Sequence, residues 1–471
     1  MKYLCFSIFL QLLASTWIPA QKLPIQKKNV LFILVDDLNA DMSTYEHPLV
    51  KTPNLDKLAK QGIKFNKAYC QFPLCNPSRA SMLNGLRPDT TQVFGNNTYF
   101  RDILPTAITM PMFFKNNGYI TGRFGKGFHG VKSKNKEIKT IEDEPAWDQI
   151  VYPPKTHIYV KEKLTDYTPG RDIAATLNFL AADEIEDKDM LPDMELADSA
   201  VKALEKVKDK PFFFLLGLHR PHSPYIAPKK YFNMYNIKDI KLPDEPEDDL
   251  NDVPPVALWT NPPYWNVNDP EKRKEVIRAY YACVSYMDDQ MGKVLNALDR
   301  LDLTKNTVIV FVSDHGYNLS EHKQWMKQSL FEKCARVPMV IALPNAKVKG
   351  KVSEGIVEMV DLYKTVADAC GLKAPAYIEG KSLMPLLNNP NAAWDYPAYT
   401  QVARKGLMGR SIRNQRYRYT EWGNKGAELY DYTKDPKESN NLVKDPAYAA
   451  IIAEMKQLLD KKIKNRTDLQ E

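Results

Sequence analysis

Three runs of apolar residues predict strands at the centre of the fold. They are continuous, rich in β-branched residues, and span Asn29 to Val35, Phe212 to Leu218 and Thr307 to Val312. Runs without polar alternation are typical of strands that are covered on both faces. Helical patterns lie between them, a short one over Leu55 to Lys60 and a long amphipathic one over about Glu271 to Leu301. This alternation predicts an α/β fold with a mostly parallel sheet.

Polar residues follow each of the three predicted strands. They are Asp36-Asp37 after the first strand, His219-Arg220-Pro221-His222 after the second, and Asp314-His315-Gly316 after the third. Ligands of open α/β sheets bind outside the carboxyl ends of the strands, so we expect these groups to share one pocket. Carboxylates and imidazoles suit a divalent cation, and the oxygen-rich set favours calcium or magnesium over zinc. An aspartate after a single strand is as often a helix cap.

Two basic segments are candidates for the same pocket. Arg123 to His129 places Lys126 and His129 among glycines, where a backbone comes close to a ligand. Glu321 to Lys327 follows the third polar cluster by a few residues. An isolated lysine is usually a solvated surface residue, so both lysines gain a functional meaning only if their loops reach the strand ends.

Composition narrows the class of protein. The chain has 471 residues, 44% of them hydrophobic and 26% charged, which excludes disorder and a polytopic membrane protein and suggests two or three domains. Lys+Arg of 65 against Asp+Glu of 58 gives +7, too mild a balance to indicate a nucleic-acid partner. Six cysteines without a C-x-x-C pair exclude a zinc ribbon.

The first twenty residues have the pattern of a signal peptide. Lys2 precedes an apolar run from Leu4 to Leu13, and Ile18-Pro19-Ala20 follows. We therefore expect residues 1–20 to be removed and the protein to be exported. The alternative is a buried N-terminal helix. No other apolar run is long enough for a membrane span.

The most specific feature is Cys75-Asn76-Pro77-Ser78-Arg79, followed by small residues and Gly85. This pentapeptide marks cysteine oxidation to Cα-formylglycine, and with it the chain resembles the type I sulfatases of the alkaline-phosphatase-like superfamily. Gly125 to His129, His219 to His222 and His315 to His322 resemble the iduronate-2-sulfatase branch. Pro77 suits the first turn of a helix, whose N-terminus favours an anion. The alternative for Cys75 is an inert buried thiol.

The resemblance implies a metal site. Asp36, Asp37, Asp314 and His315 would bind one calcium ion, which also contacts the formylglycine at position 75. Asp314 would take the proton of the formylglycine hydrate.

The resemblance also assigns the other catalytic residues. Arg79 would bind the deprotonated hydrate, while Lys126 and His129 would hold its second hydroxyl. Lys327 and His222 would contact the sulfate, with His222 protonating the leaving alkoxide.

The expected organisation is a sulfatase domain over residues 27–385 and a smaller C-terminal α+β subdomain over 386–471. Alternating aromatic and polar residues from Pro397 to Tyr432 predict a short antiparallel sheet. A terminal amphipathic helix is expected from about Ala447 to Lys464.

By resemblance, the expected function is hydrolysis of sulfate esters on sulfated carbohydrates, in the periplasm or outside a bacterial cell. The expected partners are this substrate and a formylglycine-generating enzyme or anaerobic maturase. Two alternatives stay open: a phosphodiesterase or phosphonate monoester hydrolase of the same superfamily, and a non-catalytic carbohydrate-binding relative.

Overall fold

The computed structural model describes residues 27–134, 142–152, 164–166, 180–186, 189–244, 246–258 and 269–463. The predicted signal peptide lies outside these residues. Within them, no helix combines the length and the apolar character needed to cross a bilayer.

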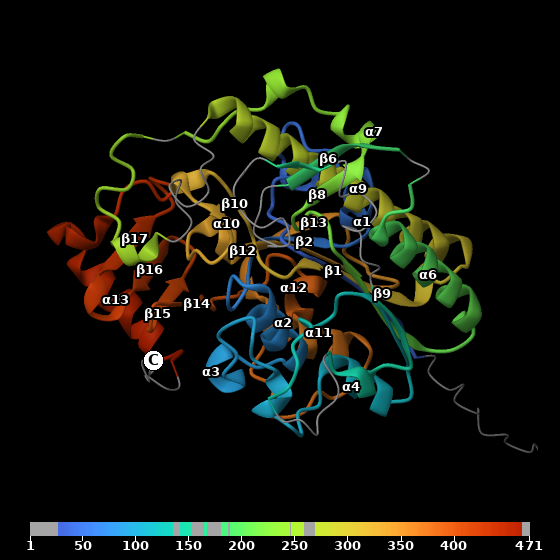
Figure 1. Cartoon of the computed structure of the whole chain (residues 1–471). Helices are drawn as coiled ribbons and strands as arrows, with labels where there is room; N and C mark the ends of the chain where they lie inside the picture. Colours follow the sequence, from blue (N-terminus) through green and yellow to red (C-terminus); the bar gives the residue numbers. More distant parts are fainter. Residues whose placement is uncertain are drawn as a thin grey trace, which may run out of the picture.

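An eight-stranded sheet forms the centre of the molecule (Figure 1). Its strands run in the order β13-β2-β12-β9-β1-β7-β3-β4, and only β12 is antiparallel to its neighbours. The predicted mostly parallel sheet is thus confirmed. In chain order the strands are β1 (Asn29–Val35), β2 (Ile63–Tyr69), β3 (Ile120–Gly125), β4 (Gln149–Val151), β7 (Phe212–Leu218), β9 (Thr307–Ser313), β12 (Arg336–Ala342) and β13 (Lys351–Glu358).

Helices cover both faces of this sheet, as expected for an α/β fold. Alternate residues of β1 enter two separate cores, with Leu31 and Ile33 in one and Phe32 and Leu34 in the other. The first core is covered by α1 (Pro53–Gln61), α6 (Pro192–Val207) and α9 (Pro270–Arg300). The second is covered by α2 (Cys75–Asn84), α4 (Met110–Asn116), α11 (Leu362–Ala369) and α12 (Met384–Asn388). The two predicted helices correspond to α1 and α9.

Shorter elements connect these layers. A three-stranded sheet contains β5 (Thr165–Asp166), β6 (Leu180–Ile185) and β8 (Tyr225–Pro228), and a hairpin pairs β10 (Asn318–Leu319) with β11 (Trp325–Met326). Among the described residues, the main body also contains the short helices α3 (Pro88–Thr91), α7 (Lys229–Phe232) and α10 (Glu332–Ala335).

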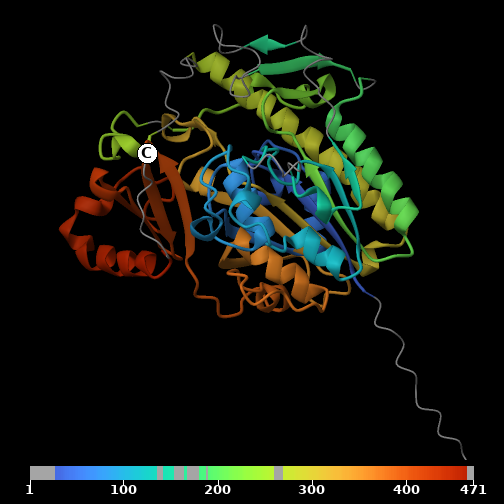
Figure 2. The same cartoon turned by 60° about the horizontal axis from the view of Figure 1, so that its bottom comes forward.

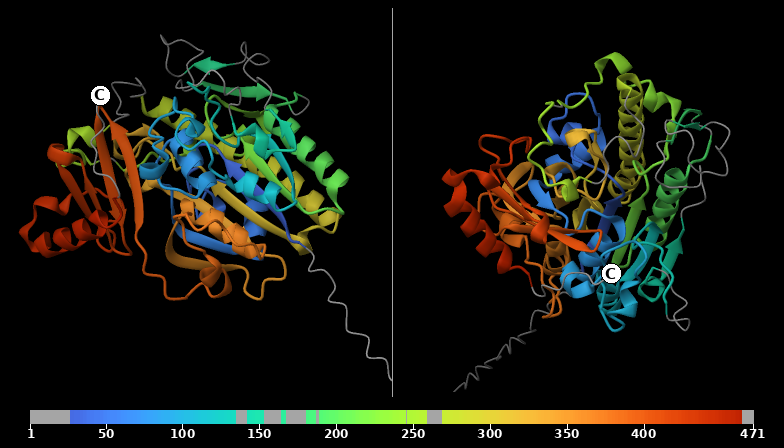
Figure 3. Two further views of the ribbon diagram at one scale, coloured as in Figure 1. Left: turned by 90° about the horizontal axis from the view of Figure 1, so that it is seen from below. Right: turned by 60° about the vertical axis from the view of Figure 1, so that its left-hand side comes forward.

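The predicted C-terminal antiparallel sheet is also present. Figures 2 and 3 show it beside the main body, with α13 (Ala449–Asp460) on its outer side. Its strands are β14 (Ala398–Arg404), β15 (Leu407–Arg413), β16 (Tyr417–Glu421) and β17 (Ala427–Asp431). The domain boundary after residue 385 stays a prediction. Helix α12 crosses this position, and its Leu386 and Leu387 pack into the main core.

Candidate active site

Four buried side chains form a compact group that could hold a metal ion. They are Asp36 and Asp37 after β1, His315 after β9, and Cys75 at the start of α2, and their ligand atoms lie within 4.8 Å of one another. The parallel register of β1 with β9 brings the two strand ends together. The N-terminus of α2 adds a positive dipole end at Cys75. This donor set fits a divalent cation.

Asp314 lies beside this group and is held by other partners. Its Oδ1 accepts hydrogen bonds from the backbone N–H of Asp37 (3.2 Å) and of His315 (3.0 Å). Its Oδ2 accepts the Nε of Arg79 at 2.8 Å. Its Oδ1 is also 3.6 Å from the Nε2 of His315, so Asp314 remains close to the candidate metal position.

Arg79 is fully buried and bridges two strand ends. Its Nη2 lies 3.4 Å from Asp36 Oδ1, and its Nη1 donates to the carbonyls of Lys126 (2.9 Å) and Gly127 (3.0 Å). Burial disfavours the guanidinium, but Asp314 and Asp36 outweigh this and raise the pKa of Arg79. Arg79 therefore stays charged and fixes the loop after β3 against the end of β1.

Two lysines hold the paired aspartates in the ionised form. Lys126 Nζ is 2.6 Å from Asp36 Oδ2, and Lys327 Nζ is 2.6 Å from Asp37 Oδ1 and 3.2 Å from Cys75 Sγ. Burial opposes ionisation of Asp36, but Lys126 and Arg79 hold its pKa well below the usual range. Burial likewise opposes ionisation of Asp37, while His222 and Lys327 lower its pKa. Both basic loops thus reach the strand ends, which is the condition under which Lys126 and Lys327 are site residues and not solvated surface lysines.

The segment after β7 contributes two stacked imidazoles. The rings of His219 and His222 lie 4.8 Å apart between centroids. His222 Nε2 is 3.8 Å from Asp37 Oδ2, and its Nδ1–H donates to the carbonyl of Ser223 at 2.6 Å. His219 Nδ1 is 3.6 Å from Asp36 Oδ2, and its side chain is 34% exposed. His219 was not among the predicted site residues, although it belongs to the polar cluster that follows this strand.

His129 is a half-buried imidazole in the same electrostatic environment. Its Nδ1 has no hydrogen-bond partner among the described residues. Burial and the nearby Lys126 lower the pKa of His129 to about 3. The ring is therefore neutral at physiological pH.

Close backbone contact between β3 and β7 positions Lys126. A Cβ at Gly217 would lie 2.0 Å from the Lys126 carbonyl oxygen, and one at Gly125 would lie 2.1 Å from the Gly217 oxygen. No side chain fits at that separation, so glycine at both positions brings the Lys126 loop onto the end of β7.

Gly217→Ala should therefore destabilise the protein, by about 3 kcal/mol, because the added methyl group displaces backbone. Gly95→Ala is the matched control, since a Cβ there meets no atom within 4 Å. Denaturant unfolding measures both variants, and equal stability of the two would contradict this role of Gly217.

Comparison with known proteins identifies the family of this chain. A sulfatase family model matches residues 28–372, and a model of the N-sulphoglucosamine sulphohydrolase C-terminal region matches 320–465. A sulfatase of Formosa agariphila is 34% identical over 93% of this chain and 87% of its own length. The iduronate 2-sulfatase of Homo sapiens is 32% identical over 88% of this chain and 91% of its own length.

Solved structures show the same fold. One, a complex with D-glucosamine-2-N,6-O-disulfate, has a TM-score of 0.75 at 24% identity and covers 95% of this chain and 100% of its own. A phosphonate monoester hydrolase of Silicibacter pomeroyi has a TM-score of 0.79 at 22% identity, covering 94% and 96%. At such identities the likeness concerns the fold alone. Because one family model spans most of the chain and two relatives exceed 30% identity over most of it, the chain belongs to the sulfatase family.

Proposed function

We propose that this protein hydrolyses sulfate esters of sulfated carbohydrates, with a formylglycine at position 75 as nucleophile and a calcium ion beside it. The observation that carries the proposal is the placement of Cys75 at the N-terminus of α2, within the Asp36–Asp37–His315 group. Export to the periplasm or the medium, and maturation by a formylglycine-generating enzyme or anaerobic maturase, belong to the same proposal.

The residues around Cys75 fit a hard cation. Asp36 Oδ1 is buried and makes no hydrogen bond with the described residues, and the Nη2 of Arg79 lies 3.4 Å from it. Two carboxylates and an oxygen at position 75 would supply the hard donors that calcium prefers. Calcium bound there would act as a Lewis acid on the sulfate oxygens.

The remaining residues would organise the nucleophile. The Sγ of Cys75 stands where a hydroxyl of the hydrated aldehyde would lie, 3.2 Å from the ammonium of Lys327. Such a hydrate has one hydroxyl to attack sulfur and a second whose deprotonation releases sulfate. Asp314 would accept the first proton, neutral His129 the second, and Arg79 and Lys126 would stabilise the negative charge.

His222 would protonate the departing sugar oxygen. Its Nδ1–H is fixed on the Ser223 carbonyl, which leaves Nε2 facing the metal group. A bound sulfate adds negative charge near this nitrogen and favours its protonation.

His222→Gln should slow release of a sugar sulfate by about 10²–10⁴-fold, because an alkoxide leaves poorly without a proton. A nitrophenyl sulfate, whose phenolate leaves without help, serves as the internal control and should lose much less. Equal losses on the two esters would contradict the assignment of His222 as the acid.

The carbohydrate substrate is supported by similarity to the human iduronate 2-sulfatase. Parallel turnover assays on sulfated oligosaccharides, aryl sulfates and phosphate or phosphonate esters test it. Preference for the phosphorus esters would support the hydrolase alternative, and no turnover by a protein with converted Cys75 would support a non-catalytic relative.

A further inference from the structure

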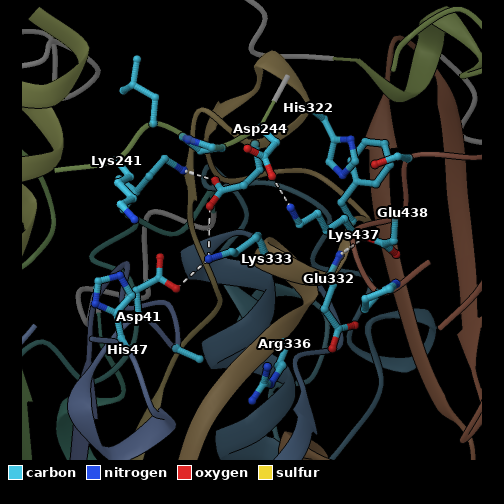
Figure 4. Close-up of a pocket in the computed structure, with 18 of the residues that line it drawn as sticks. Asp41, His47, Lys241, Asp244, His322, Glu332, Lys333, Arg336, Lys437 and Glu438 are labelled. Carbon is cyan, nitrogen blue, oxygen red and sulfur yellow. Dashed lines mark hydrogen bonds and ion pairs between the residues drawn. The ribbon is translucent and has the colours of Figure 1, made fainter. Parts of the chain in front are cut away.

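A second large pocket lies outside the candidate active site (Figure 4). Its volume is about 710 Å³, within the usual range of small-ligand sites. Its wall combines the loop after β1, residues 241–244, Pro246 and Asp249, helix α9, the β10–β11 hairpin, α10 and residues 436–439. The hairpin that supplies Leu319 and His322 to this wall ends just before Lys327, so the two sites are neighbours.

Every acidic side chain that lines this pocket already has a cationic partner. Lys333 binds both Asp41 (2.6 Å) and Glu321 (3.1 Å), and Figure 4 shows its contact with Asp41. The other pairs are Lys437 with Asp244, His322 with Asp249, and Arg418 with both Glu332 and Glu438. These six carboxylates thus share four partners, Lys333, Lys437, His322 and Arg418, and each carboxylate has at least one of them.

Two cations of the lining have no such partner among the described residues. The side chain of Arg336 forms no hydrogen bond or ion pair with the described residues, its buried Nε has no hydrogen-bond partner there, and its guanidinium lies 5.6 Å from the centre of the Tyr45 ring. Burial opposes ionisation of the nearby Glu332, whereas Arg418 and Arg336 both lower the pKa of its carboxyl group. The ion pair of Glu332 is with Arg418, not with Arg336. Lys241 is exposed, and its side chain likewise forms no hydrogen bond or ion pair with the described residues. Figure 4 shows Lys241 at the upper left of the drawn group and Arg336 at its lower edge.

The rest of the wall suits the ring of an organic ligand. Tyr281, Phe331, Ile277 and Leu319 supply apolar surface to the wall. Guanidinium and ammonium groups without partners favour a carboxylate or sulfate, and arginine binds such anions in a bidentate manner.

We propose that this pocket is a second saccharide site, which binds a sugar unit carrying a sulfate or a carboxylate through Arg336 and Lys241. The sugar part rests on the proposed function, whereas the anionic part rests on the pocket itself. A polymeric substrate could then be held at a unit other than the one that is hydrolysed.

The test uses the full chain with Cys75→Ala, so that no probe is turned over. A chondroitin sulfate hexasaccharide and a hyaluronan hexasaccharide, which both carry carboxylates, are titrated by calorimetry. Lys241→Ala and Arg336→Gln should each weaken binding by about tenfold, the usual scale for a charged hydrogen bond. Lys349→Ala, another exposed lysine, is the matched control and should leave binding unchanged.

The two probes separate the sources of the anion. Weakening confined to the sulfated probe assigns the site to sulfate, and weakening of both assigns it to carboxylate. Affinities of both probes that neither substitution changes would overturn the proposal.

A separate assay keeps this proposal distinct from the proposed function. With Cys75 restored, Lys241→Ala and Arg336→Gln should release sulfate from a nitrophenyl ester within about twofold of the parent, because neither residue lies in the candidate active site. A parent without sulfatase activity would contradict the proposed function and leave the binding result to decide on the pocket.

Discussion

Replacing Cys75 by alanine is expected to reduce sulfate release by about 10⁴-fold or more, the scale seen when a covalent nucleophile is removed. The substitution deletes the atom that lies 3.2 Å from Lys327 Nζ and 3.5 Å from His315 Nε2. The fold should survive, because α2 begins at this residue and alanine is compatible with a helix. Sulfate release and thermal unfolding, measured on the same preparation, separate the two effects.

Cys75→Ser refines this result. A serine hydroxyl can attack sulfur once, but it offers no second hydroxyl to expel the sulfate afterwards. We expect at most one sulfate transferred per protein molecule, followed by near-complete loss of turnover. Cys370→Ala is the matched control, since that cysteine lies near Lys28 at the other end of the sheet, and its activity should equal that of the parent. Steady turnover by Cys75→Ser would contradict the two-hydroxyl mechanism.

Neutralising Asp37 should have the second largest effect. Asp37 Oδ1 lies 2.6 Å from Lys327 Nζ and 3.3 Å from His315 Nε2, so its charge balances the cations of the group. Asp37→Asn removes a charged donor from the candidate calcium site and leaves the buried Lys327 with less compensation. We expect calcium affinity and turnover to fall by about 10²-fold or more.

Calorimetric titration with calcium and turnover at saturating calcium measure these two losses. The control is Asp299→Asn, because Asp299 pairs with Lys57 at the exposed end of α9. Calcium should also raise the unfolding temperature of the parent by mass action and have little effect on Asp37→Asn. Unchanged calcium affinity in Asp37→Asn would contradict the placement of the metal.

The sequence predicted the parts of the fold that follow from local patterns. Continuous apolar runs identified β1, β7 and β9, and the rule that ligands gather at carboxyl strand ends brought Asp36, His222 and Asp314 into one place. The antiparallel β12 could not be predicted, because strand direction depends on which neighbours pair across the sheet. Burial alone does not reveal it.

Pairings inside the site were harder to predict. The contact of Arg79 with Asp314 depends on how α2 lies over the ends of β1 and β9, a tertiary relation without a local signal. His219 was within a recognised cluster, but its exposure and its stacking on His222 are visible only in three dimensions. The second pocket is lined by segments that are distant in sequence, so no local sequence motif predicts it.

Peptide mass spectrometry of the segment around Cys75, combined with active-site titration, tests the central claim most directly. Preparations with different degrees of conversion are compared for sulfate release. The account predicts that activity rises in proportion to the fraction of peptide that carries an aldehyde at position 75. Full activity in a preparation whose residue 75 is entirely thiol would contradict it.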